Sequence, residues 1–225
     1  MKLIIYVLVL CLSSFFFSCA PSLVFSPSLN LPSKPLEKHQ TRVTGGFEML
    51  QETVPQKADR FLTPGFSASI AYGFTNSLSL QAKGWMGLQE VESNSTRFGL
   101  SLSGLIYLND SAKSIRAALI PCFGMTFDDN NFGDGKGVGI WFAAWFPTET
   151  NFKPYCAIGT AFGWEDLEGP IEDFGLGIFL NPGLTVESGK YIEWNLELSS
   201  SLIFNRYENS TYFVFAPSIG IGIKF

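Results

Sequence analysis

The sequence predicts an all-β protein: a closed, antiparallel, up-and-down transmembrane β-barrel of about ten strands, with eight or twelve as alternatives. From residue 41 to the end, apolar and polar residues alternate in segments of about 10 to 14 residues, long enough to cross a bilayer at a tilt. Turn residues separate these segments. Aromatic residues make up 15% of the chain and charged residues only 16%, against roughly 25% charged in soluble domains. This composition suits a sheet whose outer surface meets lipid.

Residues 1–18 are predicted to be a secretory signal peptide. Lys2 precedes an apolar run from Leu3 to Phe17, and small residues follow it. This layout is typical of a signal that is removed after export. The alternative is a retained anchor helix, which needs roughly 20 apolar residues and therefore a longer run than this one.

The residues that end this run, Phe16-Phe17-Ser18-Cys19, resemble the lipobox of bacterial lipoproteins. In that family a small residue precedes a cysteine that is acylated and becomes the new N-terminus. Ser18 and Cys19 match the pattern, whereas Phe16 stands where Leu is usual. The resemblance implies that Cys19 carries a lipid. The alternative is an ordinary signal that is cleaved near Ala20.

Residues 19–40 are predicted to be a lipid-anchored tether, and residues 41–225 the barrel. The tether is rich in serine and proline, a composition that disfavours packed structure and suits a semi-extended linker. Its prolines are Pro21, Pro27, Pro32 and Pro35.

The expected strands are assigned from their alternation. The ninth is the clearest, because apolar residues from Ile192 to Leu198 alternate with polar residues from Glu193 to Ser199, and a period of two places them on opposite faces. The sixth is aromatic on both faces, so the sequence does not orient it. The strands are expected near residues 41–51, 63–73, 78–86, 98–108, 115–125, 137–146, 152–164, 174–185, 192–199 and 212–225. The apolar face carries Phe66, Ala68 and Ile70 in the second, Leu78, Leu80 and Ala82 in the third, Phe98, Leu100 and Leu102 in the fourth, Ala117, Leu119 and Phe123 in the fifth, and Cys156, Ile158 and Phe162 in the seventh.

The connections between these strands alternate in length. Bacterial barrels have short periplasmic turns and longer outer loops. An even strand count then places both ends of the barrel, and the N-terminus, on the periplasmic side. The short connections lie near residues 75, 110, 148 and 188, and the longer, more polar ones at 52–62, 89–96, 128–136, 165–173 and 204–211.

The last segment alternates up to a terminal aromatic residue. Ile219, Ile221 and Ile223 share one face with Phe225, and Lys224 lies on the other. This segment resembles the C-terminal strand of bacterial outer-membrane barrel proteins. The resemblance implies that Phe225 belongs to the signal for the barrel-assembly machinery. It further implies the outer membrane of a Gram-negative cell as the location, with membrane lipid and lipopolysaccharide as surroundings.

A closed sheet satisfies its own backbone groups, so it can lie in lipid with its apolar face outward and its polar face toward the lumen. Aromatic residues near the strand ends are then expected to form girdles at the two membrane interfaces. The candidates are Tyr72, Phe98, Tyr107, Phe127, Phe146, Trp164, Tyr191, Tyr212 and Phe225.

The chain offers little for acid–base or nucleophilic catalysis. Its one histidine, His39, lies in the predicted tether, which excludes a Ser-His or Asp-His site in the barrel. Glu193 and Glu197 share a face but lie roughly 13 Å apart along a strand, too far to share one reaction centre. No catalytic residue and no cofactor is therefore predicted. A polar network in the lumen is expected instead, formed by Lys83, Arg97, Arg116, Glu193 and Glu197.

Neither a metal site nor a nucleic-acid partner is predicted. The acidic segment 128–135 is rich in oxygen ligands, but Phe132 stands at the fifth position, where a calcium loop needs a ligand. The net charge of −5, without a basic cluster, argues against nucleic acid. Cys122 and Cys156 are expected on non-adjacent strands and opposite faces, as small buried hydrophobes, with a disulfide as the alternative.

The sequence favours a non-enzymatic outer-membrane barrel with a structural or surface-interaction role. A narrow, porin-like pore for ions or small solutes is an alternative, because Gly159, Ala161 and Gly163 leave room in the lumen. A soluble, lipocalin-like barrel that binds an apolar ligand is another, and it would turn the apolar face inward. A barrel enzyme would require a reactive group that the predicted strands lack.

Overall fold

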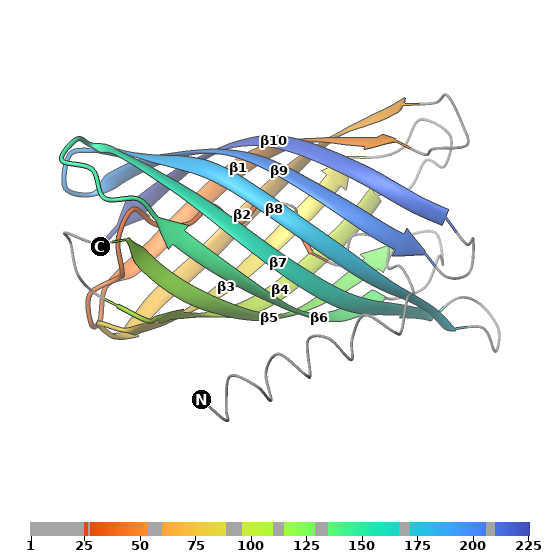
Figure 1. Cartoon of the computed structure of the whole chain (residues 1–225), viewed down its shortest axis with the longest axis horizontal. Coiled ribbons are helices and arrows are strands. Elements are labelled where there is room, and N and C mark those ends of the chain that lie inside the picture. The colour runs from red at the N-terminus through yellow and green to blue at the C-terminus, as the bar shows by residue number, and fades with distance from the viewer. Residues whose placement is uncertain are drawn as a thin grey trace.

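The computed structural model is a single closed barrel of ten antiparallel strands, which confirms the predicted fold class and strand count (Figure 1). It describes residues 25–26, 28–53, 60–88, 96–109, 115–128, 135–166, 172–205 and 210–225. Among these residues no helix is long and apolar enough to cross a membrane. The strands are β1 (Thr41–Thr53), β2 (Arg60–Thr75), β3 (Leu78–Leu88), β4 (Thr96–Tyr107), β5 (Arg116–Asp128), β6 (Gly135–Trp145), β7 (Phe152–Asp166), β8 (Glu172–Ser188), β9 (Ile192–Asn205) and β10 (Ser210–Lys224).

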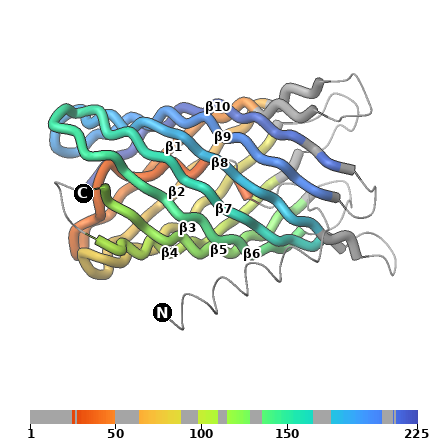
Figure 2. Tube along the Cα trace, viewed as in Figure 1, coloured from red at the N-terminus to blue at the C-terminus, as the bar shows by residue number. Residues whose placement is uncertain are grey.

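Each strand pairs with its neighbours in the sequence, and β1 pairs with β10 to close the ring. At this seam Arg42 lies opposite Lys224 and Phe47 opposite Ile219. Two backbone hydrogen bonds extend the seam to the last residue, since Phe225 N donates to Thr41 O at 2.8 Å and Thr41 N donates to Phe225 O at 3.2 Å. The strands slant across the long axis of the barrel (Figure 2), as closure requires.

The two faces of the sheet have the predicted orientation. On β9 the side chains of Ile192, Trp194 and Leu196 are exposed on the outer surface, whereas Glu193 and Glu197 are buried in the lumen. The same outer surface exposes Phe98, Leu100 and Leu102 of β4 and Ile219, Ile221 and Ile223 of β10. The lipocalin-like alternative, which needs the apolar face inside, is therefore wrong.

Strand β6, which the sequence did not orient, turns Trp141, Ala143 and Trp145 into the lumen and exposes Ile140 and Phe142. Both of its faces are apolar because this side of the lumen contains an aromatic cluster. Tyr107, on β4, belongs to the same cluster and is 6% exposed.

The expectation that Tyr107 forms part of an interfacial girdle is therefore wrong. Odd-numbered residues of β4 face inward, and the Tyr107 ring lies 6.0 Å from that of Trp145. The Tyr212 side chain lies outside the described residues. The other candidates are exposed or half-buried and not in the buried core: Tyr72, Phe98, Phe127, Phe146, Trp164, Tyr191 and Phe225.

Cys122 and Cys156 are free thiols. They lie on β5 and β7, which β6 separates. Cys122 packs against the buried cluster, whereas the side chain of Cys156 alternates with the buried Tyr155 and Ala157 and so points outward. The expected placement on non-adjacent strands and opposite faces is confirmed. The expected burial is wrong for Cys156, whose side chain lies on the outer face and is only partly buried.

Residues 25–26 and 28–36, assigned from the sequence to the tether, differ from that expectation. Phe25, Leu31 and Leu36 are buried at 4%, 1% and 1% exposure. Phe25 and Leu31 belong to the aromatic cluster inside the barrel. We call this segment the N-terminal plug. The residues that follow the plug reach the end of the barrel at which β1 begins, where His39 N donates to Gly73 O at 2.8 Å.

The outward apolar band predicts a depth-dependent cost for a buried charge. Leu102 lies midway along β4, and Leu108 follows the last residue of that strand. In a bilayer, we expect Leu102→Arg to lower the free energy of unfolding by about 2–4 kcal/mol, and Leu108→Arg by about 0–1 kcal/mol. Guanidinium unfolding in lipid vesicles, followed by tryptophan fluorescence, measures both. Equal costs at the two positions would contradict the membrane-spanning orientation.

Candidate functional site

The candidate site is the lumen, together with the N-terminal plug that occupies it. The ring of strand pairs closes through β1 and β10 without any contribution from the plug, and no described plug residue belongs to a strand. A barrel of eight strands is just filled by its own side chains. A ten-strand barrel is wider, and the plug occupies the additional space.

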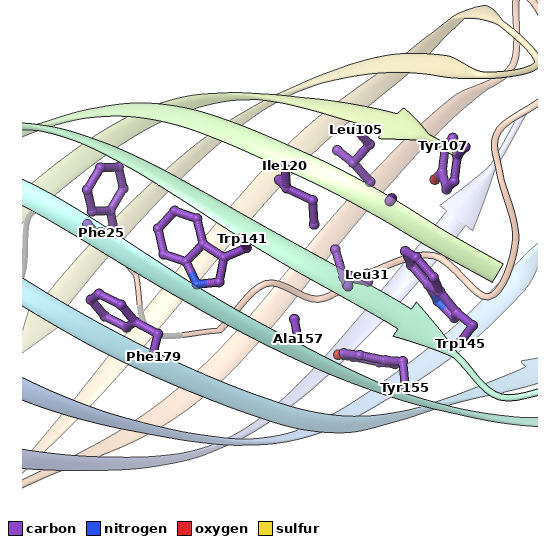
Figure 3. Packing of buried hydrophobic residues seen from close by; sticks show 13 residues of the cluster. Phe25, Leu31, Leu105, Tyr107, Ile120, Trp141, Trp145, Tyr155, Ala157 and Phe179 are labelled. Atoms are coloured by element: carbon purple, nitrogen blue, oxygen red, sulfur yellow. The ribbon is translucent and has the colours of Figure 1, made fainter. Parts of the chain in front are cut away.

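One half of the lumen is apolar and aromatic (Figure 3). The Phe25 ring meets the edge of Trp141 at a centroid distance of 5.5 Å, and Trp141 lies 5.4 Å from Phe179. Trp145 Nε1 donates to the backbone oxygen of Pro32 at 2.9 Å. The aromatic half thus packs against Phe25, Leu29 and Leu31 of the plug and binds one backbone carbonyl. Its further members include Leu105, Tyr107, Ala118, Ile120, Ala143, Tyr155 and Ala157.

The first polar cluster joins β1 and β3 to the start of the plug. Glu48 accepts hydrogen bonds from the hydroxyls of Ser26, at 2.7 Å, and Ser28. Lys83 lies 3.3 Å from Glu48. The Lys83 ammonium also donates to Ser26 Oγ at 2.6 Å and to the backbone oxygen of Ser28 at 2.5 Å. The two serines therefore complete the hydrogen bonding of a buried ion pair.

The second cluster centres on Glu197 of β9. This carboxylate accepts from the backbone N–H groups of Leu29, at 2.8 Å, and Asn30, at 3.0 Å. The hydroxyl of Tyr155 donates to it at 2.5 Å, and Asn181 Nδ2 at 2.9 Å. Glu197 has no cationic partner among these contacts, so the plug backbone supplies two of the donors that a buried carboxylate needs.

The third cluster lies nearest to the short-turn end. Glu193 forms ion pairs with Arg42, at 3.0 Å, and with Lys224. The backbone N–H of Ser33 donates to the same carboxylate at 3.2 Å. Arg42 also donates to the backbone oxygen of Asn30 at 2.8 Å. All three charged side chains are at most 3% exposed.

The wall is shaped for the plug as well as charged for it. A Cβ atom on Gly220 would lie 2.8 Å from Asn30 Oδ1, and one on Gly73 would lie 2.2 Å from the backbone oxygen of Glu37. Asn30 has a positive φ of 51°, a conformation that asparagine tolerates better than most residues. Glycine in the wall and asparagine in the plug therefore allow a close approach that larger residues would prevent.

A small cavity of mixed character remains beside the plug. Its volume is about 30 Å³, and its lining includes the polar residues Ser26, Gln81 and Lys83 and the apolar residues Phe25, Ile120 and Trp141. A water molecule needs roughly 10–15 Å³ measured in this way and two to four polar partners. The cavity therefore has room for a few water molecules and for no larger solute.

The predicted lumen residues are partly brought together. Lys83, Glu193 and Glu197 face the lumen, but each lies in a different cluster. Arg116 is half-buried and belongs to none of the three clusters. The side chain of Arg97 lies outside the described residues.

Sequence reasoning did not assign Arg42, Glu48 and Lys224 to the network, nor the serines of the plug. Lys224 lies on the polar face of the last strand, so its alternation could have identified it. Arg42 and Glu48 flank Gly45-Gly46, in a strand with weak alternation. Even so, the spacing of an even number of residues places both on one face.

His39 is exposed near the short-turn end, where its Nδ1 lies 2.7 Å from the hydroxyl of Tyr72. No group of three or more potential metal ligands occurs among the residues that the structure describes. The segment 129–134 lies outside them.

No protein-family model matches the chain, and no curated protein matches it in sequence. Solved structures do match its fold. An outer-membrane channel from Pseudomonas putida gives a TM-score of 0.54 at 10% identity, over 86% of this chain and 98% of the channel. The chain has the fold of a bacterial outer-membrane β-barrel. The outer-membrane protease OmpT from Escherichia coli gives a TM-score of 0.51 at 8% identity, over 89% of this chain and 100% of the protease. At these identities the similarity concerns the fold alone.

Because Glu193 is paired with two buried cations and Glu149 with none among the described residues, loss of one carboxylate charge is expected to affect stability differently at these two positions. Glu193→Gln leaves Arg42 and Lys224 buried without their anionic partner, so we expect the free energy of unfolding to fall by about 3–5 kcal/mol. Glu149→Gln, in an exposed turn, should change it by no more than about 0.5 kcal/mol. Denaturant unfolding of both variants in the same detergent compares them. A cost at Glu193 no larger than that at Glu149 would contradict the described ion pairs.

Proposed function

We propose that this protein is a non-enzymatic barrel of the bacterial outer membrane, closed by its own N-terminal plug, with a structural or surface-interaction role. The observation that carries the proposal is the occupied lumen, in which three buried carboxylates bind donors of the plug. The exposed apolar band supports a location in lipid. The fold shared with barrels that are named for the outer membrane supports that membrane in particular.

A non-enzymatic role is supported by how the lumen carboxylates are engaged. Glu193 is held by Arg42 and Lys224, and Glu197 by hydrogen bonds from the plug and the wall. A general acid or base must reach a proton of the substrate, and in this lumen the plug lies against these groups. OmpT is a protease, but the likeness to it concerns the fold and carries no activity to this chain.

A narrow pore is the second candidate. The wall supports it, because small and polar residues line much of β8, β9 and β10. The plug opposes it, since the cavity beside the plug is only about 30 Å³. A pore therefore requires displacement of the plug.

The anchoring and assembly signals belong to the same proposal. Cys19 would hold the protein through a lipid, and it lies outside the described residues. Phe225 would serve as the assembly signal. Its side chain is 72% exposed while its backbone closes the seam with Thr41, so its ring is accessible to a partner. In this proposal the short-turn end, at which β1 begins and β10 ends, would face the periplasm.

The closed state is testable in planar bilayers. We expect the purified full-length protein to give no discrete conductance steps, because the plug fills the lumen. The same preparation should migrate differently in a detergent gel before and after boiling, since a folded membrane barrel resists detergent in the cold. Steady conductance by the intact protein would favour the pore. Absence of a mobility shift, together with extraction by carbonate, would overturn the membrane barrel itself.

The lipid anchor is testable by labelling with radioactive palmitate during growth. We expect label in the wild-type protein and none in Cys19→Ala, because the acylated thiol is absent from the variant. Cys11→Ala serves as the matched control and should retain the label, since Cys11 lies within the predicted signal peptide. Equal labelling of all three proteins, or of none, would refute acylation at Cys19.

A further inference from the structure

The contacts between plug and wall have the character of ligand binding. Wall side chains bind backbone groups of six consecutive plug residues, Ser28 to Ser33, as Glu197 does for Leu29 and Asn30. Asn195 Nδ2 and Thr185 Oγ1 both donate to Leu31 O, at 2.7 and 3.0 Å. Trp145 donates to Pro32 O. Side chains that bind the backbone of an extended segment in this way recognise a peptide by the path of its backbone.

The remaining contacts define which peptide fits. The Glu48–Lys83 pair accepts small hydroxyl residues at positions 26 and 28. The close approach of Gly46 and Gly220 leaves room for the amide of Asn30 and for little more. Leu31 packs in the aromatic half. The site therefore suits an extended peptide that is rich in serine, with one asparagine and one apolar residue at fixed places.

The barrel wall does not need the plug for its own closure. All ten strand pairings lie within the ring. Polar atoms that the plug now satisfies would face a water-filled lumen after its release. Hydrogen bonds to the plug would then be exchanged for hydrogen bonds to water, and such an exchange has a modest net free energy.

We propose that the lumen is a peptide-binding site, with residues 25–36 as its resident and exchangeable ligand, and that release of this ligand opens an aqueous path through the barrel. The inference rests on the proposed membrane location and goes beyond the closed barrel. The chain itself provides the occupant, and the described link to β1 runs through residues 37–40. This link is exposed at Glu37, Lys38 and His39.

Cleavage in the link separates the plug from the barrel while the barrel remains folded. A recognition sequence for a site-specific protease is inserted between Lys38 and His39 of the Cys19→Ala protein, so that no lipid holds the released segment in the membrane, and the folded protein is placed in a planar bilayer. We expect no conductance before cleavage and discrete conductance steps after cleavage and washing, with the freed peptide detected by mass spectrometry. The Cys19→Ala protein without the insertion, treated with the same protease, is the control and should show no conductance.

Return of the peptide tests the specificity of the site. A synthetic peptide of residues 25–38 should close the cleaved barrel again. The same peptide with Asn30→Leu should not, because the branched side chain has no room beside Gly46 and Gly220. In a cleaved barrel that carries Glu197→Gln, the closing concentration should rise about tenfold or more, since two backbone N–H groups lose a charged acceptor. Equal closure by both peptides would overturn the proposal.

A variant without an insertion gives an independent answer. Leu31→Asp places a carboxylate in the aromatic half and weakens the ligand while leaving the wall unchanged, so the uncut chain should open intermittently. Lys34→Gln, at an exposed position, should stay closed. A silent Leu31→Asp barrel, or a cleaved barrel that retains its plug or loses it without conducting, would overturn the inference. Heat-dependent gel mobility of each sample reports separately on the barrel and thus on the proposed function.

Discussion

Three buried carboxylates in the lumen require hydrogen-bond donors, and the rest of the structure depends on this requirement. Glu48, Glu193 and Glu197 lie in a lumen from which bulk water is largely displaced, and an unpaired buried charge is strongly unfavourable. Cations of the wall satisfy two of them in part, through Lys83 and through Arg42 with Lys224. Glu197 instead takes backbone N–H groups from the plug. The plug is therefore part of the electrostatic balance of the barrel as well as its filling.

Alternation made the wall predictable. The period of two is unbroken from Ile192 to Ser199 in β9 and from Ser218 to Phe225 in β10. In these segments it shows which side chains meet lipid and which meet the lumen. The terminal pattern up to Phe225 likewise anticipated a closing strand, and the structure pairs it with β1. These features are local, because each depends on residues that are adjacent in one segment.

The plug and the aromatic half of the lumen were not predictable in this way. Residues 25–36 have no periodicity, and Leu29 is bound by a carboxylate 168 positions away. From the sequence alone, the polar composition of this segment resembles that of a solvated linker, because the residues that bind it lie far away in the chain. The orientation of β6 and the inward position of Tyr107 were not predicted for a related reason. Where the lumen is aromatic, the inner and outer faces of a strand are both apolar, and the contrast on which alternation depends is lost.

Closure of the wall and closure of the lumen have different physical origins. Backbone hydrogen bonds close the ring and suffice in lipid. Side chains close the lumen, and they do so asymmetrically, with an aromatic surface against Phe25 and Leu31 and a charged surface against the plug backbone. A change in the plug alters the second closure without breaking a strand pair. One chain can in this way combine a rigid wall with an occupant that is bound by side-chain contacts alone.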